Sequence, residues 1–197
     1  MITGMSSSTP DPARRNERSR LAILAAAVAL IGELGYERVS IEAIAQRAGV
    51  GKATIYRWWP SKGAVVLEAL HDSLATVVDF PDTGDIVADL RTQMRGVVQL
   101  LGSTEVGRVY QGLLAAAQSD PELSRAHLEQ VIEPANVACH ERIARAQDRG
   151  EMRADVDRRV MIDMLWGAIY YRLLLHTRPL ESEQIDAALD IAFQGLR

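Results

Sequence analysis

The amino-acid sequence predicts an all-α protein. Aliphatic side chains dominate a chain in which 48% of the residues are hydrophobic and only 5% are aromatic. Apolar residues recur at helical spacing through most of the chain, and the polar–apolar alternation that is typical of strands is absent. Glycine and proline residues interrupt these stretches as interhelical turns do. We therefore expect an N-terminal domain of three helices, a connecting helix and a C-terminal helical bundle.

The first helix is expected to begin at Pro12, after the N-cap Asp11. Residues 1–10 are rich in Ser, Thr and Gly and contain no Lys or Arg, so we expect a disordered arm there. Arg14 and Arg15 precede an uncharged run, which could indicate a twin-arginine signal peptide. The run continues into Glu33 without a small-residue cleavage site and forms a helical apolar stripe, so we favour a helix of a folded domain.

Two short helices joined by a tight turn are predicted between Ser40 and Pro60. Ser40 is a suitable N-cap, and Gly49 stands where a helix needs a left-handed residue to end. A second helix should run from about Lys52 to Trp58, because the residue before proline is pushed out of helical geometry. The first of the two helices presents one apolar face, formed by Ile41, Ile44, Ala45 and Ala48.

The outward face of the second helix has the chemistry of a DNA-recognition helix. Lys52 and Arg57 can pair with guanine edges or phosphates. The side chain of Thr54 can contact a thymine methyl group or a phosphate, and the Tyr56 hydroxyl and the Trp58 N–H are rigid donors for phosphate oxygens. This segment therefore predicts a helix-turn-helix that binds double-stranded DNA.

The alternative is that Tyr56, Trp58 and Trp59 are core aromatics of a small helical domain. We accept that interpretation for Trp59 alone, since three neighbouring aromatics cannot all face inward on a seven-residue helix. Lys62 lies at the start of the next helix, where backbone N–H groups also favour an anion.

The segment resembles the DNA-binding domain of the TetR family of bacterial transcriptional regulators over about residues 18–66. The matching residues are Gly35-Tyr36, Ser40-Ile41, Ile44-Ala45, Ala48-Gly49-Val50 and Thr54-Ile55-Tyr56-Arg57-Trp58-Trp59-Pro60-Ser61-Lys62. The resemblance implies that Thr54, Tyr56, Trp58 and Lys62 contact phosphates or bases, and that Lys52 and Arg57 help to set sequence preference. We include Ser40 in this candidate DNA-binding set. The family usually has Tyr, His or Phe where Trp58 and Trp59 stand, which is a mild departure.

The charge distribution agrees with DNA binding by the N-terminal part. The chain has a net charge of −4, which divides into +3 for residues 1–60 and −7 for the remainder. A basic head on an acidic body favours local phosphate binding. The single cysteine, Cys139, excludes an intramolecular disulfide and fits a reducing cytoplasm. No run approaches the roughly 20 apolar residues that span a bilayer, so we expect a cytoplasmic protein without a membrane partner.

We divide the chain into a disordered arm (1–10), a helix-turn-helix domain (11–60), a connecting helix (61–80) and a C-terminal ligand-binding and dimerisation domain (81–197). Helices are expected in this last domain at about 85–101, 105–118, 121–148, 158–176 and 182–195. The run from Val160 to Leu175 is apolar on nearly every side, so it should be buried on every side. Together with the last helix it would form a four-helix bundle in a homodimer, as the resemblance implies. The candidate interface residues are Ile162, Trp166, Ile169, Leu173, Ile185, Leu189 and Phe193.

The resemblance also implies a small-molecule effector that binds the C-terminal domain and changes the spacing of the two DNA-binding domains of the dimer. Candidate ligand contacts are Met94, Val98, Tyr110, Leu114, Trp166 and Tyr170, although each could equally be core or interface. We expect a repressor that an effector releases from a near-palindromic operator. An activator, or a DNA-binding adaptor without a ligand, remains the alternative. We expect no enzyme, because Cys139 and His140 diverge on a helix and no nucleophile–base pair is evident. The four histidines lack metal-ligand spacing, and no cofactor or metal is expected.

Overall fold

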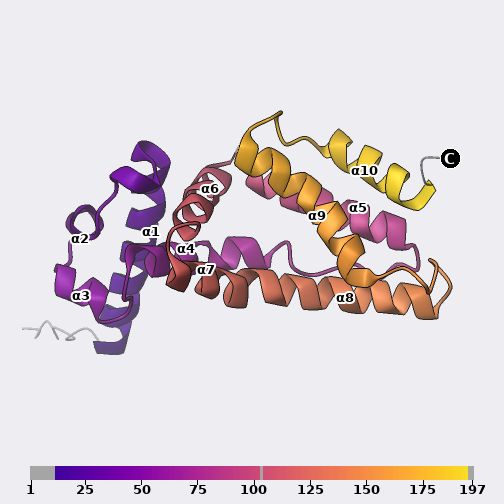
Figure 1. Ribbon diagram of the computed structural model, residues 1–197. Helices are drawn as coiled ribbons and strands as arrows, with labels where there is room; N and C mark the ends of the chain where they lie inside the picture. The colour runs from indigo at the N-terminus through magenta and orange to yellow at the C-terminus, as the bar shows by residue number, and fades with distance from the viewer. Residues whose placement is uncertain (1–11, 103, 195–197) are drawn as a thin grey trace, which may run out of the picture.

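The computed structural model describes residues 12–102 and 104–194 and is helical with short connections (Figure 1). The arm predicted for residues 1–10 lies outside the described residues. In the N-terminal part, three helices gather at one end of the molecule and a fourth leads away from them (Figure 1). These elements are α1 (Pro12–Leu34), a 3₁₀ turn (Tyr36–Arg38), α2 (Ile41–Ala48), α3 (Lys52–Tyr56) and α4 (Lys62–Ala75).

The turn between α2 and α3 forms as its residues predict. The Ser40 hydroxyl accepts a hydrogen bond from the Ala43 N–H at 3.2 Å, and Gly49 is left-handed at φ 68°. Ser61 caps α4 in the same way, through the Ala64 N–H at 3.2 Å. Helix α3 is two residues shorter than expected, because the chain tightens into a turn after Tyr56 before it reaches Pro60.

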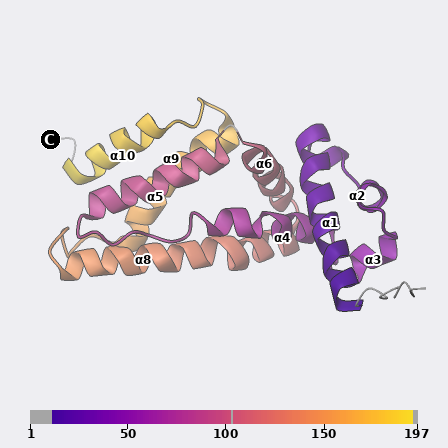
Figure 2. The same cartoon turned by 180° about the vertical axis from the view of Figure 1, so that it is seen from behind.

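The C-terminal part forms a layered bundle in which α5 lies beside α10, and α9 runs between them and the long α8 (Figures 1 and 2). Residues 121–148, expected as one helix, contain a π-helical turn. The cause is Pro134, which lacks an N–H and crowds the carbonyl four residues before it. The elements are α5 (Ile86–Leu101), α6 (Glu105–Ala117), α7 (Pro121–His127), the π turn (Leu128–Ile132), α8 (Glu133–Asp148), α9 (Arg158–Leu175) and α10 (Ser182–Gln194).

Helices α6 and α7 join the two parts of the molecule through close contacts at glycines. A Cβ atom on Gly112 of α6 would lie 2.6 Å from the Cβ of Tyr36, so the tyrosine rests directly on the glycine backbone. Gly63, near the start of α4, accepts Leu123 of α7 in the same manner, with the Leu123 Cδ1 only 2.7 Å from a built Cβ. The position of α6 and α7 is therefore tied to the position of the DNA-binding helices.

A buried ion-pair network fixes the far end of the bundle. The guanidinium of Arg142 on α8 is fully buried and lies 2.6 Å from Asp89 of α5 and 2.6 Å from Glu151 of the α8–α9 loop. The guanidinium and the Thr83 hydroxyl and N–H hold the pKa of Asp89 below its usual value against the opposing effect of burial. Removal of Arg142 would leave Asp89 buried without its ion pair, at a cost of about 3–5 kcal/mol.

Within the described residues, none of the helices combines the length and apolarity that crossing a bilayer requires. In the same part of the chain, no three His, Cys, Asp or Glu side chains gather in a way that could hold a metal ion.

Candidate functional site

Helix α3 presents an exposed, mostly cationic and aromatic face at the end of the molecule. Lys52, Tyr56 and Arg57 are exposed, Thr54 and Trp58 are half-buried, and Ile55 points into the core. The Tyr56 side chain is 47% exposed, which is unusual for so large a ring and leaves its hydroxyl free to reach a partner. The structure thus brings together five of the seven candidate DNA-binding side chains on and just after one short helix.

Contacts within this face orient its charged groups. The Lys52 ammonium pairs with Glu42 of α2 and lies 5.5 Å from the centre of the Tyr56 ring. The Arg57 guanidinium lies 5.1 Å from the Trp58 ring, which meets the buried Trp59 edge-on at 89°. The Lys52–Glu42 pair is exposed and therefore weak, so a phosphate can replace the carboxylate at little cost.

Trp59 is a core residue, as predicted, with 3% of its surface exposed. Its indole N–H donates to a carboxylate oxygen of Glu68 on α4. The second oxygen of Glu68 accepts from Arg20 of α1. This chain of contacts anchors the end of the α3 turn to both supporting helices.

The structure places Lys62 differently from the other candidates. Its ammonium donates to the carbonyl oxygens of Tyr36 at 2.7 Å and Val39 at 3.0 Å, and it lies 4.0 Å from the Tyr36 ring centre. Burial lowers the pKa of Lys62. Two of its three N–H donors are therefore used inside the protein, and its part in phosphate binding stays a prediction. Ser40 is likewise occupied as a cap, and a DNA contact by its hydroxyl stays a prediction.

Ala53 is a residue that sequence reasoning missed. It is exposed on α3 between Lys52 and Thr54. A methyl group at that position can contact a thymine methyl in the major groove. Its place one residue into the second helix was the available signal, because the first residues of a recognition helix are the ones that contact bases.

In the C-terminal domain the structure brings two of the six candidate ligand residues into direct contact. The Tyr110 hydroxyl on α6 lies 3.0 Å from the Tyr170 hydroxyl on α9. It also lies 2.8 Å from Nε2 of His127 on α7. Burial raises the pKa of Tyr110 and Tyr170 and lowers that of His127, so each group favours its neutral form. We call these three residues the polar triad.

His127 was not a sequence candidate for this site. It sits at the end of α7, directly before the π turn, and is only 8% exposed. The available signal was Pro134, since the π turn it causes is a feature that often accompanies functional sites. The remaining ligand candidates are core residues or lie at its edge. Met94, Val98 and Leu114 are buried, and Trp166 is half-buried with its ring 6.1 Å from that of Phe80.

The predicted dimer interface stays a prediction, but most of its residues are enclosed within a single chain. Five of its residues are 5% exposed or less within a single chain and therefore belong to the core, namely Ile162, Ile169, Leu173, Ile185 and Leu189. Trp166 and Phe193 are half-buried. Side chains already enclosed by their own chain cannot form the contact surface of a second one. The apolar side chains that α9 and α10 leave exposed are others, namely Val160, Met164, Tyr171, Leu174, Leu175 and Ile191.

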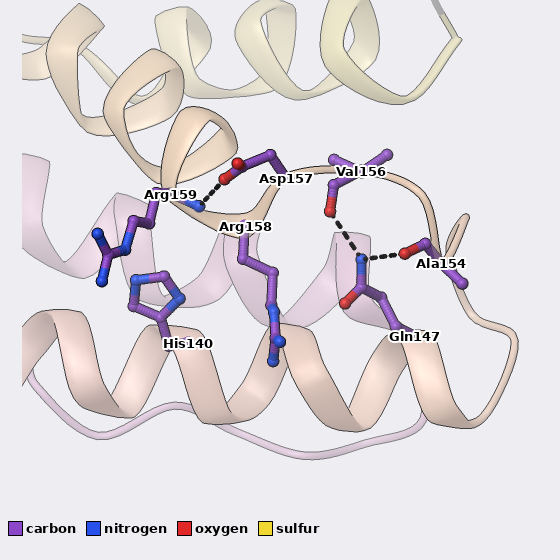
Figure 3. Close-up of a pocket in the computed structure, with 7 residues that line it drawn as sticks. All are labelled: His140, Gln147, Ala154, Val156, Asp157, Arg158 and Arg159. Atoms are coloured by element: carbon purple, nitrogen blue, oxygen red, sulfur yellow. Dashed lines mark hydrogen bonds between the residues drawn. The ribbon is translucent and has the colours of Figure 1, made fainter.

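A polar cleft of about 540 Å³ lies between α8 and the start of α9 (Figure 3). His140 projects from α8 toward Arg158 and Arg159, while Asp157 caps α9 through the Arg159 N–H at 2.8 Å. Gln147 donates to the Val156 carbonyl at 2.9 Å and so holds the loop that closes one side of the cleft. The residues that line it offer no nucleophile with an adjacent base, so this cleft carries no catalytic constellation.

Two family models match the chain. "Bacterial regulatory proteins, tetR family" matches residues 23–69, and "Tetracyclin repressor-like, C-terminal domain" matches residues 80–192. The HTH-type transcriptional regulator YdeS of Bacillus subtilis is 33% identical over 183 residues, which cover 93% of this chain and 92% of YdeS. The DNA-binding transcriptional repressor TetR of Mycobacteroides abscessus is 32% identical over 163 residues, which cover 82% of this chain and 85% of that protein.

Solved structures agree with this assignment. The TetR family transcription regulator SCO0332 superposes with a TM-score of 0.75 at 34% identity, over 91% of this chain and 99% of that one. FadR of Bacillus subtilis, solved with stearoyl-CoA, superposes with a TM-score of 0.73 at 21% identity, over 90% of this chain and 99% of that one. The all-α fold, the helix-turn-helix and the DNA-binding function predicted from the sequence are thereby confirmed. The chain belongs to the TetR family of helix-turn-helix, DNA-binding transcriptional regulators.

Proposed function

We propose that the protein is a homodimeric repressor that a small, largely apolar effector releases from a near-palindromic operator. The observation that carries the proposal is the polar triad of Tyr110, His127 and Tyr170. Tyr110 and His127 stand on α6 and α7, the two helices that contact the N-terminal helices, and Tyr170 joins them from α9. The repressor of Mycobacteroides abscessus, at 32% identity, supports repression over activation.

The triad suits an effector that has an apolar body and one polar group. Three neutral hydrogen-bonding groups that satisfy one another can exchange a partner for a ligand hydroxyl, carbonyl or carboxylate without leaving a buried group unpaired. Met94, Val98, Leu114 and Trp166 supply apolar surroundings on the candidate ligand helices. The structural neighbour that was solved with stearoyl-CoA supports a ligand of mixed character, although at 21% identity it carries only the fold.

Release would follow from the contacts of α6 and α7. A ligand that parts Tyr110 from His127 displaces one of these helices relative to the other. Gly112 carries the movement to Tyr36, and Leu123 carries it to Gly63 at the start of α4. Both contacts are too close to absorb a shift by compression, so the helix-turn-helix must move with them.

The exposed apolar stripe of α9 supports the homodimer. Val160, Met164, Gly167, Tyr171 and Leu174 follow one another at alternating spacings of four and three, as at a helix–helix seam. A Cβ atom on Gly167 would meet no other atom within 4 Å, which leaves room for a partner helix. Clefts of about 390 and 620 Å³ lie on either side of Met164, where partner side chains can enter. Two copies of α9 and α10 would then form a four-helix bundle and set the two α3 helices about one DNA turn apart.

The first experiment is selection of bound sequences from random duplex DNA by the purified protein. A near-palindrome with half-sites about one turn apart supports the proposal, and weak binding without sequence enrichment contradicts it. Addition of candidate effectors to the complex then separates a ligand-released repressor from an adaptor, whose DNA binding no ligand would change.

The dimer is tested by Met164→Glu, compared with Leu34→Glu on α1. Both positions expose an apolar side chain, Met164 at 54% and Leu34 at 45%. Sedimentation should show a monomer for Met164→Glu and a dimer for Leu34→Glu, because only the first change buries a carboxylate in the proposed interface. A stable dimer in both variants would place the interface elsewhere.

A further inference from the structure

A second cleft, of about 640 Å³, lies between α1 and α4 where α6 begins. It is separate from the polar triad and from the exposed face of α3. Its apolar lining comes mainly from α1, and Leu21 there is 54% exposed. The apolar residues that line it are Leu21, Leu24, Ala25, Val28, Ala29 and Ala69. A volume of this size is within the range that small-molecule sites occupy.

The charged lining of this cleft is predominantly acidic. Glu68, Asp72 and Glu105 contribute three carboxylates against the one guanidinium of Arg20, and the imidazole of His71 also lines the cleft. That guanidinium is already held between Glu17 and Glu68. Within the part of the chain that the structure describes, Asp72 and Glu105 have no hydrogen-bond or ion-pair partner. Both residues are exposed, so the cleft offers two hydrated carboxylates without an ion-pair partner at the rim of an apolar floor.

Glu105 adds a link between the two parts of the molecule. It stands in the first turn of α6, yet its carboxylate reaches back over α1, where Oε1 lies 2.6 Å from the position that a Gly32 Cβ would take. Asp72 faces the same cleft from α4. A cation between these carboxylates would thus touch the DNA-binding domain and the C-terminal domain together.

We propose that this cleft binds a small amphiphile with a cationic head and an apolar tail. The apolar floor takes the tail, and Asp72 and Glu105 take the head. Charge complementarity favours this class, since an anionic amphiphile would meet three carboxylates and a neutral one would gain no ion pair with Asp72 or Glu105. A ligand bound in this cleft would hold α1, α4 and α6 in one arrangement. It would thereby regulate the DNA-binding domains independently of the polar triad.

The test uses octyltrimethylammonium below its critical micelle concentration, with octyl glucoside as the neutral probe that has the same tail. Binding to the full-length protein is measured by isothermal titration calorimetry at low and at physiological salt. We expect saturable binding of one cationic probe per chain, weakened by salt, and at least tenfold weaker binding of the neutral probe.

Two matched double variants locate the site. Asp72→Asn with Glu105→Gln removes the proposed head-group partners and should weaken the cationic probe about tenfold. Glu141→Gln with Asp148→Asn removes the same charge from exposed positions on α8 and should change nothing. Ala29→Phe fills the floor and should abolish binding. The acid variants keep the test valid should Ala29→Phe fail to fold.

Equal binding of both probes, or equal loss in both double variants, would overturn the proposal. A third outcome would also overturn it: no probe binds the unmodified protein, and Ala29→Phe changes the oligomeric state seen in sedimentation. The cleft would then be occupied by a second copy of the chain.

Discussion

The hydroxyl of Tyr110 is the part of the C-terminal domain whose removal makes the sharpest prediction. Tyr110 is 1% exposed, and its hydroxyl contacts His127 Nε2 at 2.8 Å and the Tyr170 hydroxyl at 3.0 Å. Tyr110→Phe removes one oxygen and leaves the ring in place. Both partners then lose their contact, and both polar groups are buried, since burial raises the pKa of Tyr170 and lowers that of His127.

The cost follows from the burial of each partner. An unsatisfied polar group in the interior costs about 1–3 kcal/mol, and a bond to a group that can reach water is worth about 0.5–1.5 kcal/mol. Tyr110→Phe belongs to the first case, because it leaves His127 and Tyr170 unpaired, while Tyr170→Phe belongs to the second, because the Tyr110 hydroxyl keeps its contact with His127. Tyr110→Phe should therefore lower the free energy of unfolding by about 2–3 kcal/mol, and Tyr170→Phe by about 1 kcal/mol.

Urea unfolding at one fixed protein concentration measures both values from the midpoint and slope. The double variant should lose less than the sum of the single variants, because both changes remove the same Tyr–Tyr bond. A loss below about 0.5 kcal/mol for Tyr110→Phe would refute the reasoning. Additive losses would show that the two hydroxyl groups do not interact.

Three further predictions concern DNA contact, pH and coupling. Tyr56→Phe should weaken binding to all duplex sequences about equally, by roughly three- to tenfold in fluorescence anisotropy, and a changed sequence preference would contradict a phosphate contact. Burial lowers the pKa of His127, so the unfolded chain binds more protons below about pH 6.5. The free energy of unfolding should fall as the pH drops through that value. The urea midpoint should depend less on pH in His127→Gln than in the unmodified protein, and the same pH dependence in both would mean that another group causes the effect. Gly112→Ala should cost about 1–3 kcal/mol, because the new Cβ would lie 2.6 Å from that of Tyr36. Gly96→Ala in α5 should cost nothing, because its Cβ would lie 3.6 Å from Val77 Cγ1, an ordinary van der Waals contact. Equal thermal midpoints for the two alanine variants would mean that Tyr36 does not rest on α6.

The elements of the fold were predictable because their signals are local. Ser40 and Ser61 cap helices, and Gly49 ends one, through contacts that span only three or four residues. The helices of the C-terminal domain begin and end within about two residues of their expected positions for the same reason. The π turn was missed because a proline inside a periodic stretch indicates a disturbance without specifying its form.

The contacts that define the candidate sites were not predictable, since they join residues that are distant in the sequence. Tyr110 and Tyr170 are 60 residues apart, and Arg142 and Asp89 are 53 apart. Nothing near Arg142 in the sequence distinguishes it from the exposed arginines of the same helix. Lys62 gives the opposite lesson. A cation at a helix start suggested a phosphate ligand, whereas its ammonium in this structure binds the carbonyls of Tyr36 and Val39.

The faces of α9 show why composition alone does not locate an interface. A helix that is apolar on nearly every side indicates that both of its faces are buried in the native protein. The sequence does not tell which face is covered by the helix's own chain. The packing of α9 against α6, α8 and α10 decides that question, and it encloses the face of Ile162, Ile169 and Leu173. The opposite face keeps Met164 and Tyr171 more than half exposed. A continuous apolar stripe that its own chain leaves exposed is typical of an interaction surface, and for this reason we propose the second face as the dimer contact.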